Sequence, residues 1–222
     1  MQPSNPVTIV TLPLRILLVD DHIIVRDGLK QILSKHFAQA VFGEACNGRE
    51  ALGAIEKNPW DVILLDITMP GQSGLDILKQ IKNLQPEARV LVLTMHPEDQ
   101  YAARVLKAGA SGYLTKETAS EEVVNALIKI LAGGKYVSAA FAQILISGLA
   151  NPTPKAPHEI LSDREYQLLR MTAAGKTVKE IGADLGLSVK TISTYRTRVL
   201  KKLNLKTNAD IIRYAIREKL VE

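Results

Sequence analysis

The sequence predicts a doubly wound α/β domain with a five-stranded parallel sheet, followed by a second, all-α domain. Short β-branched runs alternate with segments of helical periodicity as far as residue 133. The runs at 16–19 and 62–65 are apolar without interruption, as in strands that helices cover on both faces. After a proline-rich stretch at 151–157, only helical periodicity remains.

The expected elements follow in a regular order. Strands are predicted at residues 14–20, 40–46, 61–66, 89–94 and 111–115. Helices are predicted between them, such as those at 23–37 and 74–84, with a last one at 120–132. After a short connecting helix at 139–149, four helices are expected at 163–174, 178–185, 189–203 and 208–219. This order divides the chain into an N-terminal extension (1–13), an α/β domain (14–133), a linker with the connecting helix (134–157) and a helical domain (158–222).

Composition excludes several classes of protein. With 222 residues, of which 46% are apolar, the chain can bury packed cores and is not a disordered chain. It has no run of about 18 apolar residues, and residues 1–13 lack a secretory signal, so we expect a cytoplasmic protein with no membrane partner. The single cysteine, Cys46, can form no internal disulfide and lies in an apolar stretch, which favours a buried structural thiol.

Charge is distributed unevenly along the chain. Residues 1–150 hold 14 Lys and Arg against 15 Asp and Glu, whereas residues 151–222 hold 14 against 8. Neutralising phosphates is the main sequence-independent source of affinity for nucleic acid. The helical domain is therefore the part expected to meet a polyanion.

Polar residues follow four of the predicted strands. Asp20 and Asp21 follow the first, Asp66 ends the third, Thr94 ends the fourth and Lys116 follows the fifth. Because the carboxyl ends of parallel strands meet at one edge of a sheet, these side chains are expected to converge. Three close carboxylates repel one another and favour a hard divalent cation, for which Mg²⁺ is the expected ion. Lys116, Thr94 and the metal would neutralise a phosphoryl group, so the pocket predicts phosphoryl transfer to aspartate.

These residues belong to an ordered set that resembles the signature of receiver domains in two-component response regulators, over about residues 14–133. The set comprises Asp20-Asp21-His22, Arg26, Gly28-Leu29, Asp66 in Leu-Leu-Asp-Ile-Thr-Met-Pro-Gly, Thr94, and Gly-Tyr-Leu-Thr-Lys at 112–116. The resemblance implies a flavodoxin-like fold whose Asp66 accepts phosphoryl from a sensor histidine kinase, in a protein that is not an enzyme.

The same resemblance implies a role for each residue of the pocket. Asp20, Asp21, Asp66 and the backbone carbonyl of Thr68 would bind Mg²⁺, and Lys116 would pair with the phosphate. Thr94 and Tyr113 would form a switch pair, with the hydroxyl drawn towards the phosphoryl oxygen and the ring turning inward.

Two residues next to the pocket, Glu117 and His22, carry expectations of their own. Many receivers have proline after the lysine, preceded by a cis bond, whereas Glu117 stands here, so the geometry of the Lys116–Glu117 bond is open. His22 is expected to cap or pack at the first helix.

Helix boundaries in the second domain are marked by capping residues. Ser162 and Glu165 have the spacing of a capping box, and Gly175-Lys176-Thr177 ends one helix and starts the next. Gly186 allows a left-handed turn before Ser188 caps the third helix. A turn of about three residues between the second and third helices is helix-turn-helix spacing.

The third of these helices has two faces. Residues expected to face the core are Val189, Ile192, Tyr195 or Arg196, Val199 and Leu203. The opposite face holds Lys190, Ser193, Thr194, Thr197, Arg198 and Lys201. Between Ser188 and Lys206 there are six basic residues and no acidic one, which favours a polyanion against this surface.

Residues 158–222 resemble the LuxR-type output domain of the NarL/FixJ subfamily. The matching motifs are Leu161-Ser162-x-Arg164-Glu165, Gly175-Lys176-Thr177, Lys179-Glu180-Ile181, Leu187-Ser188-x-Lys190-Thr191 and Lys202-Leu203. By that resemblance Lys190, Ser193, Thr194 and Thr197 would address the major groove of promoter DNA, and Arg198 and Lys201 would lie nearer phosphates. The last helix would supply the contact of a homodimer.

Together these features predict a transcription regulator. Phosphorylation would release contacts that hold the DNA-binding helix, and a dimer would then bind an inverted repeat and could contact RNA polymerase. Two alternatives stay open: a phosphorylation-independent interaction module with DNA-binding output, and an aspartate-dependent phosphohydrolase. The hydrolase is disfavoured because its Asp-x-Asp pattern after the first strand is absent from Asp20-Asp21-His22.

Overall fold

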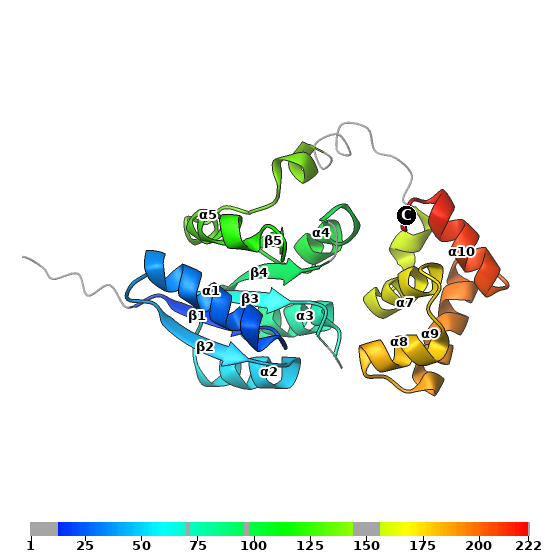
Figure 1. Ribbon diagram of the computed structural model, residues 1–222, viewed down its shortest axis with the longest axis horizontal. Helices are drawn as coiled ribbons and strands as arrows, with labels where there is room; N and C mark the ends of the chain where they lie inside the picture. Colours follow the sequence, from blue (N-terminus) through cyan, green and yellow to red (C-terminus); the bar gives the residue numbers. More distant parts are fainter. Residues whose placement is uncertain (1–12, 70–71, 96–97, 144–155, 222) are drawn as a thin grey trace, which may run out of the picture.

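The computed structural model describes residues 13–69, 72–95, 98–143 and 156–221, which form an α/β domain and a helical domain (Figure 1). The strands are β1 (Arg15–Val19), β2 (Val41–Ala45), β3 (Val62–Asp66), β4 (Arg89–Thr94) and β5 (Gly112–Thr115). They form one parallel sheet in the order β2-β1-β3-β4-β5. The predicted doubly wound fold is confirmed, and the strand order reverses between β1 and β3, where such folds bind ligands.

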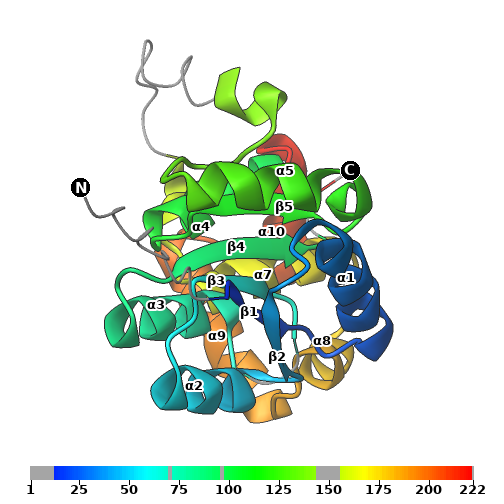
Figure 2. The same ribbon diagram turned by 90° about the vertical axis from the view of Figure 1, so that its left-hand side faces the viewer.

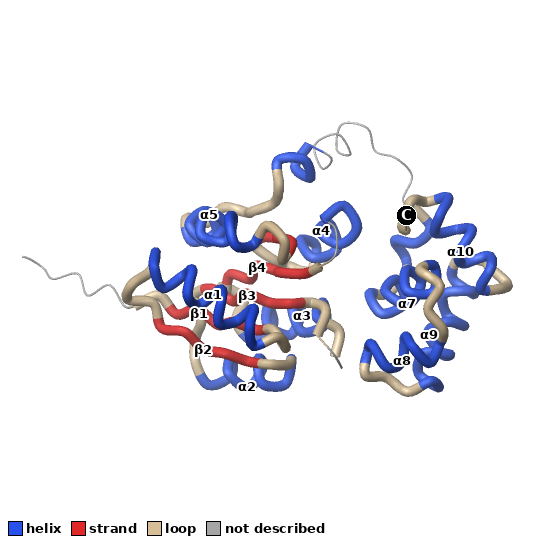
Figure 3. The backbone as a smooth tube through the Cα atoms, viewed as in Figure 1, coloured by secondary structure: helices blue, strands red, loops and turns tan. Residues whose placement is uncertain are grey.

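Helices cover both faces of this sheet, as the strands and helices in Figure 3 show. The helices of the α/β domain are α1 (Ile23–His36), α2 (Gly48–Lys57), α3 (Gly74–Leu84), α4 (Glu98–Lys107) and α5 (Ala119–Leu131). Leu33 of α1 and Leu127 of α5 are buried on one face. Ile55 of α2, Ile81 of α3 and Val105 of α4 are buried on the other. Figure 2 shows α2 and α3 on the opposite side of the sheet from α1. Burial on both faces explains why the central strands are uniformly apolar.

The second domain is helical throughout its described residues. Its elements are the 3₁₀ turn η1 (Pro157–Ile160), α7 (Asp163–Ala173), α8 (Val178–Leu185), α9 (Val189–Lys202) and α10 (Asn208–Arg217). The predicted capping box is present: Ser162 N donates to Glu165 at 2.8 Å, and Ser162 Oγ accepts from Glu165 N. Gly186 has a φ of +63°, in the left-handed region, and Ser188 caps α9. The predicted helix-turn-helix arrangement is therefore confirmed.

Three expectations are wrong or only partly within the described residues. Cys46 is exposed, because it follows the edge strand β2, and its thiol donates to Glu50 Oε1 at 3.1 Å. Val189 is 49% exposed, because it opens α9 ahead of the buried Ile192. Residues 139–143 are helical, whereas the rest of the expected connecting helix and residues 1–12 of the extension lie outside the described residues.

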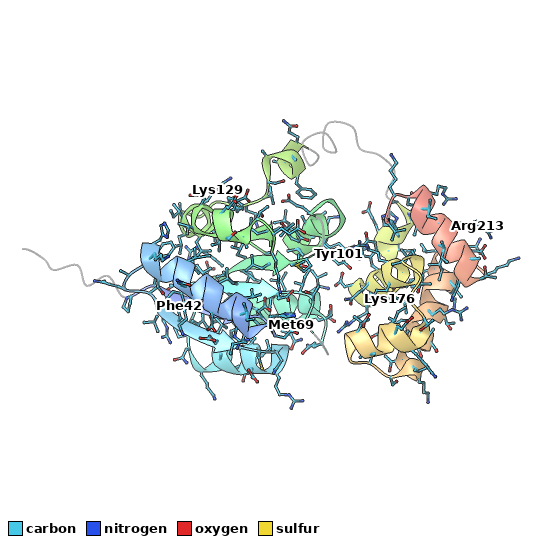
Figure 4. All side chains as sticks on the ribbon, viewed as in Figure 1. Phe42, Met69, Tyr101, Lys129, Lys176 and Arg213 are labelled. Atoms are coloured by element: carbon cyan, nitrogen blue, oxygen red, sulfur yellow. The ribbon has the colours of Figure 1, made fainter. Side chains whose placement is uncertain are left out.

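Every helix in the described part of the chain falls short of the length and apolar character that a bilayer-spanning segment requires. The two domains meet through α3 and α4 of the first and η1 and α7 of the second. Tyr101, labelled in Figure 4, lies on the side of the α/β domain that faces the helical domain.

Candidate functional site

The carboxyl ends of β1, β3, β4 and β5 bring the predicted pocket residues to one edge of the sheet. Register places Asp66 beside Leu93 and Thr94 beside Thr115. The backbone N–H of Lys116 donates to Thr94 O at 2.8 Å, which fixes where the lysine leaves the sheet. The predicted convergence is therefore a consequence of strand register.

Lys116 joins two buried carboxylates. Its Nζ lies 2.7 Å from Asp20 Oδ2 and 2.7 Å from Asp66 Oδ2, and both aspartates are almost fully buried. Burial by itself would lower the pKa of Lys116, but the adjacent Asp66 and Asp20 outweigh it, so the pKa lies above the usual 10.5. The lysine is thus a fixed positive charge beside the carboxylate that the sequence singles out.

The donor set suits a hard cation. Asp20, Asp21, His22 and Asp66 each offer one ligand atom, and these atoms lie within 4.8 Å of one another. The carboxylate oxygens are the ligands that Mg²⁺ and similar ions prefer. Thr68 approaches the same carboxylate, since its N–H donates to Asp66 Oδ1 at 2.7 Å and its hydroxyl donates to the same oxygen.

His22 and Arg26 support the pocket in ways that the sequence did not predict. His22 occupies the N-cap position of α1, but its ring is largely exposed and makes no cap hydrogen bond; instead Nδ1 lies 3.2 Å from Asp20 and 3.1 Å from Asp21. The expected place of His22 at the start of the first helix is therefore confirmed, although its ring contacts carboxylates of the pocket and not the helix terminus. Arg26 Nη1 donates to Asp20 O at 2.7 Å and Nε to Glu44 at 3.2 Å. Its buried guanidinium holds the backbone of Asp20 in place.

Thr94 and Tyr113 are both fully buried. Tyr113 belongs to the apolar cluster on the α2–α4 face, so its ring already points inward. The described residues contain no cis peptide bond, so the Lys116–Glu117 bond, which the sequence left open, is trans.

The second predicted site lies on a single helix. Lys190, Ser193, Thr194, Thr197, Arg198 and Lys201 are all exposed on α9. Ile192 and Val199 are fully buried and anchor the opposite face. Thr194 Oγ1 donates to Lys190 O, and Thr197 Oγ1 to Ser193 O, each at 3.0 Å. Because these hydroxyl protons are used within the helix, both threonines present a methyl group and an acceptor oxygen outward.

Lys202 differs from the neighbouring Lys201. Its Nζ lies 2.6 Å from Glu165 Oε2, and that carboxylate is almost fully buried. Burial tends to raise the pKa of Glu165, but Lys202 and the Ser162 donors outweigh it and hold the pKa below 4.5. One lysine of this basic run therefore belongs to the framework that joins α9 to α7.

Comparisons with known proteins agree with this two-part arrangement. The family profile described as "Response regulator receiver domain" matches residues 16–128, and the profile "Bacterial regulatory proteins, luxR family" matches residues 159–215. The response regulator UvrY of Escherichia coli is 37% identical over 208 residues, covering 93% of this chain and 95% of UvrY.

Solved structures of RcsB have the same architecture. RcsB of Salmonella enterica serovar Typhimurium, bound to a promoter in the presence of the phosphomimetic BeF₃⁻, aligns with a TM-score of 0.57 and 26% identity, covering 91% of this chain and 98% of that one. A structure of two RcsB dimers on two parallel DNAs aligns with a TM-score of 0.56, 26% identity and the same coverage. The chain belongs to the NarL/FixJ family of response regulators, which join a receiver domain to a LuxR-type DNA-binding domain.

Proposed function

We propose that this response regulator is a phosphorylation-controlled transcription factor. Asp66 accepts a phosphoryl group from a sensor histidine kinase, and the helical domain binds double-stranded promoter DNA as a dimer. In this proposal the receiver domain spans residues 14–133 and the DNA-binding domain 158–222, joined by a linker at 134–157. The observation that carries it is the bridge from Lys116 to both Asp20 and Asp66, because it sets a fixed cation beside a buried carboxylate.

The proposed transfer needs positioning and charge stabilisation more than proton transfer. A carboxylate oxygen of Asp66 attacks the phosphorus atom, the bond from phosphorus to the kinase histidine breaks, and the histidine nitrogen keeps the electron pair. Lys116 then pairs with an oxygen of the new acyl phosphate. Thr94, at the end of β4, donates its hydroxyl to another, and Tyr113 completes the switch pair.

Asp20, Asp21, Asp66 and the backbone carbonyl of Thr68 are the residues proposed to hold Mg²⁺. The three carboxylates carry more negative charge than Lys116 offsets, which supports a divalent cation rather than an empty pocket. When bound, the ion supplies positive charge that neutralises the phosphoryl oxygens.

For DNA, the exposed side of α9 is proposed to enter the major groove. Lys190, Ser193, Thr194 and Thr197 would reach base edges, with Arg198 and Lys201 nearer phosphates. Ile216 of α10 is 58% exposed and would lie in the dimer contact. A two-fold dimer places the recognition helices about 34 Å apart, so the target is an inverted repeat. Such a regulator works in the bacterial cytoplasm, where it can also contact RNA polymerase.

Intact-mass spectrometry with acetyl phosphate and Mg²⁺ tests the acceptor. The wild-type chain should gain a single phosphoryl group, and Asp66→Asn should gain none. Asp61→Asn is a matched control. Asp61 lies away from the pocket, where its carboxylate accepts a hydrogen bond of 2.8 Å from Arg15 N. Phosphorylation of Asp66→Asn at the wild-type rate would refute the assignment.

A further inference from the structure

The contact between the two domains is built from crossed pairs of tyrosine and arginine. Tyr101 and Arg104 come from α4, and Tyr166 and Arg170 come from α7. The guanidinium of Arg104 lies 4.2 Å from the ring centre of Tyr166, and that of Arg170 lies 5.6 Å from the ring centre of Tyr101. The two tyrosine rings meet edge to face at 5.5 Å. Both tyrosines are buried, so each domain completes the packing of the other.

Arg104 reaches beyond this aromatic contact to η1. Its Nη2 donates to His158 O at 2.8 Å and its Nη1 to Leu161 O at 2.9 Å. Nη1 also lies 3.5 Å from Asp163, which pairs with Lys79 of α3 at 3.2 Å. One guanidinium from the receiver thus binds two main-chain carbonyls at the entrance to α7, a geometry that a lysine could not reproduce.

His158 continues the connection to α10. Its backbone N–H donates to Tyr214 Oη at 3.1 Å, and its Nδ1 lies 3.0 Å from the same oxygen. The two rings meet edge to face, with 6.0 Å between their centres. Three residues therefore link the receiver to the proposed dimer helix, in the order Arg104, His158, Tyr214.

The DNA-facing side of α9 takes no part in this contact. Among the residues that the structure describes, the hydrogen bonds and ion pairs found between the domains end on η1, on Leu161 or on α7. Lys190, Thr194 and Arg198 instead line an open surface pocket on α9. The sequence-based expectation that receiver contacts hold the DNA-binding helix therefore finds no counterpart in these contacts.

The phosphoacceptor loop borders the same contact. Thr68, whose hydroxyl donates to Asp66, lines a cavity of about 360 Å³ together with Tyr101, Arg170 and Met171. A change at Asp66 that moves Thr68 would therefore alter the cavity that residues of both domains line.

We infer that Arg104, acting through His158 and Tyr214, sets the position of α10, so that the receiver controls dimer assembly and leaves DNA access to α9 open. This inference rests on the proposed function, which assigns α10 to the dimer contact. Arg104 is a positioning residue in this scheme, since it touches neither the phosphoryl group nor DNA.

Three variants of the full chain test the relay. Arg104→Ala removes the link to η1, and Tyr214→Phe removes the hydroxyl while keeping the ring; Arg104→Lys keeps the charge but not the two-carbonyl geometry. The unphosphorylated proteins are compared by sedimentation velocity for self-association. Fluorescence anisotropy with a non-specific 20-base-pair duplex measures the DNA affinity of the monomer.

The inference predicts that all three variants change the dimer dissociation constant by roughly tenfold, which corresponds to about 1.4 kcal/mol. Affinity for the duplex should stay within about twofold of the wild type, since α9 is already open. Unchanged self-association in all three variants would overturn the inference. Tighter duplex binding by monomeric Arg104→Ala would overturn it as well, because the receiver would then gate DNA access.

Failure of the proposed function gives a different result. If acetyl phosphate leaves the wild-type chain monomeric while Arg104→Ala and Tyr214→Phe shift self-association, the relay stands and the phosphorylation switch fails. If phosphorylation dimerises the wild type and the variants behave like it, the switch stands and the relay fails.

Discussion

The pocket around Asp66 and the exposed side of α9, which is proposed to meet DNA, are built in opposite ways. The pocket draws side chains from four strand ends, buries two of its carboxylates and joins them through one lysine. The face of α9 comes from one helix, is exposed along its length and lies over a separate buried anchor of Ile192 and Val199.

This difference determines how each region responds to change. Groups in the pocket share partners, so losing one alters the charge that all the others experience. The α9 residues proposed to contact DNA would act on different phosphates and bases, so their contributions should approach additivity. Substitutions in the pocket are therefore expected to have the larger effects.

Lys116→Ala should produce the largest effect, with two results of opposite sign. Phosphoryl transfer from acetyl phosphate should slow by about 100-fold or more, because the acyl phosphate loses its cationic partner. Mg²⁺ binding, measured by calorimetry, should tighten by about tenfold, because a positive charge next to the carboxylates is removed. Lys30→Ala, which breaks the exposed pair with Glu44, is the control. Parallel losses of transfer and Mg²⁺ affinity would show that Lys116 merely maintains the fold.

Substitutions of Thr194 test which of its groups would contact a base from the exposed side of α9. Its hydroxyl proton is used on Lys190 O, so the outward group is a methyl beside an acceptor oxygen. Thr194→Val should retain sequence preference in a randomised-duplex selection, and Thr194→Ala should relax it at one position by about 1–3 kcal/mol. Equal relaxation by both variants would mean that the hydroxyl, and not the methyl group, reads the base.

Lys201 and Lys202 are neighbours, but Lys201 is expected to act on DNA phosphates and Lys202 on the stability of the domain. Lys201→Ala should weaken binding to all duplexes alike and reduce the salt slope by about 1. Lys202→Ala should lower the free energy of unfolding of the helical domain by about 1 kcal/mol, because Glu165 loses its partner. Urea unfolding and salt-dependent anisotropy separate the two. An unchanged unfolding midpoint for Lys202→Ala would remove the distinction.

The smallest expected effect is a pH dependence of the contact between the domains. Burial, and then Arg104, lower the pKa of His158 below 6.5, against weaker opposing effects of Glu218 and Glu159. The open form therefore binds protons more readily, so stability of the closed contact is present above the ordinary pKa and is lost as pH falls below it. Intrinsic amide exchange slows as pH falls. Relative to that intrinsic rate, the protection of the η1 amides from hydrogen exchange should decrease from about pH 7.5 to about pH 5.5. His158→Asn should abolish the excess, and its persistence would contradict the assignment to His158.

The parallel sheet is the reason that the fold and the pocket could be predicted from the sequence. Uninterrupted apolar runs and intervening helical periodicity are sufficient for a doubly wound fold. Once the strands are placed, their carboxyl ends bring Asp20, Asp66 and Lys116 together without knowledge of side-chain packing. The six residues of the α9 face follow in the same way from helical period.

Features that depend on partners between elements could not be predicted. Tyr101 and Tyr166 meet edge to face, but their helices belong to domains that a linker separates in the sequence, so no local pattern indicates the contact. Cys46 was misplaced because its apolar neighbours conceal that β2 is an edge strand. The position of His22 at the start of α1 could be predicted, but the approach of its ring to Asp20 and Asp21 could not.

Sedimentation velocity of the full chain, with and without acetyl phosphate and Mg²⁺, most directly tests the link between the two regions. Wild-type protein should convert from monomer to dimer on phosphorylation and bind a duplex carrying two inverted half-sites more tightly, whereas Asp66→Asn should remain monomeric with unchanged affinity. Dimerisation of Asp66→Asn to the same extent under the same treatment would contradict the account.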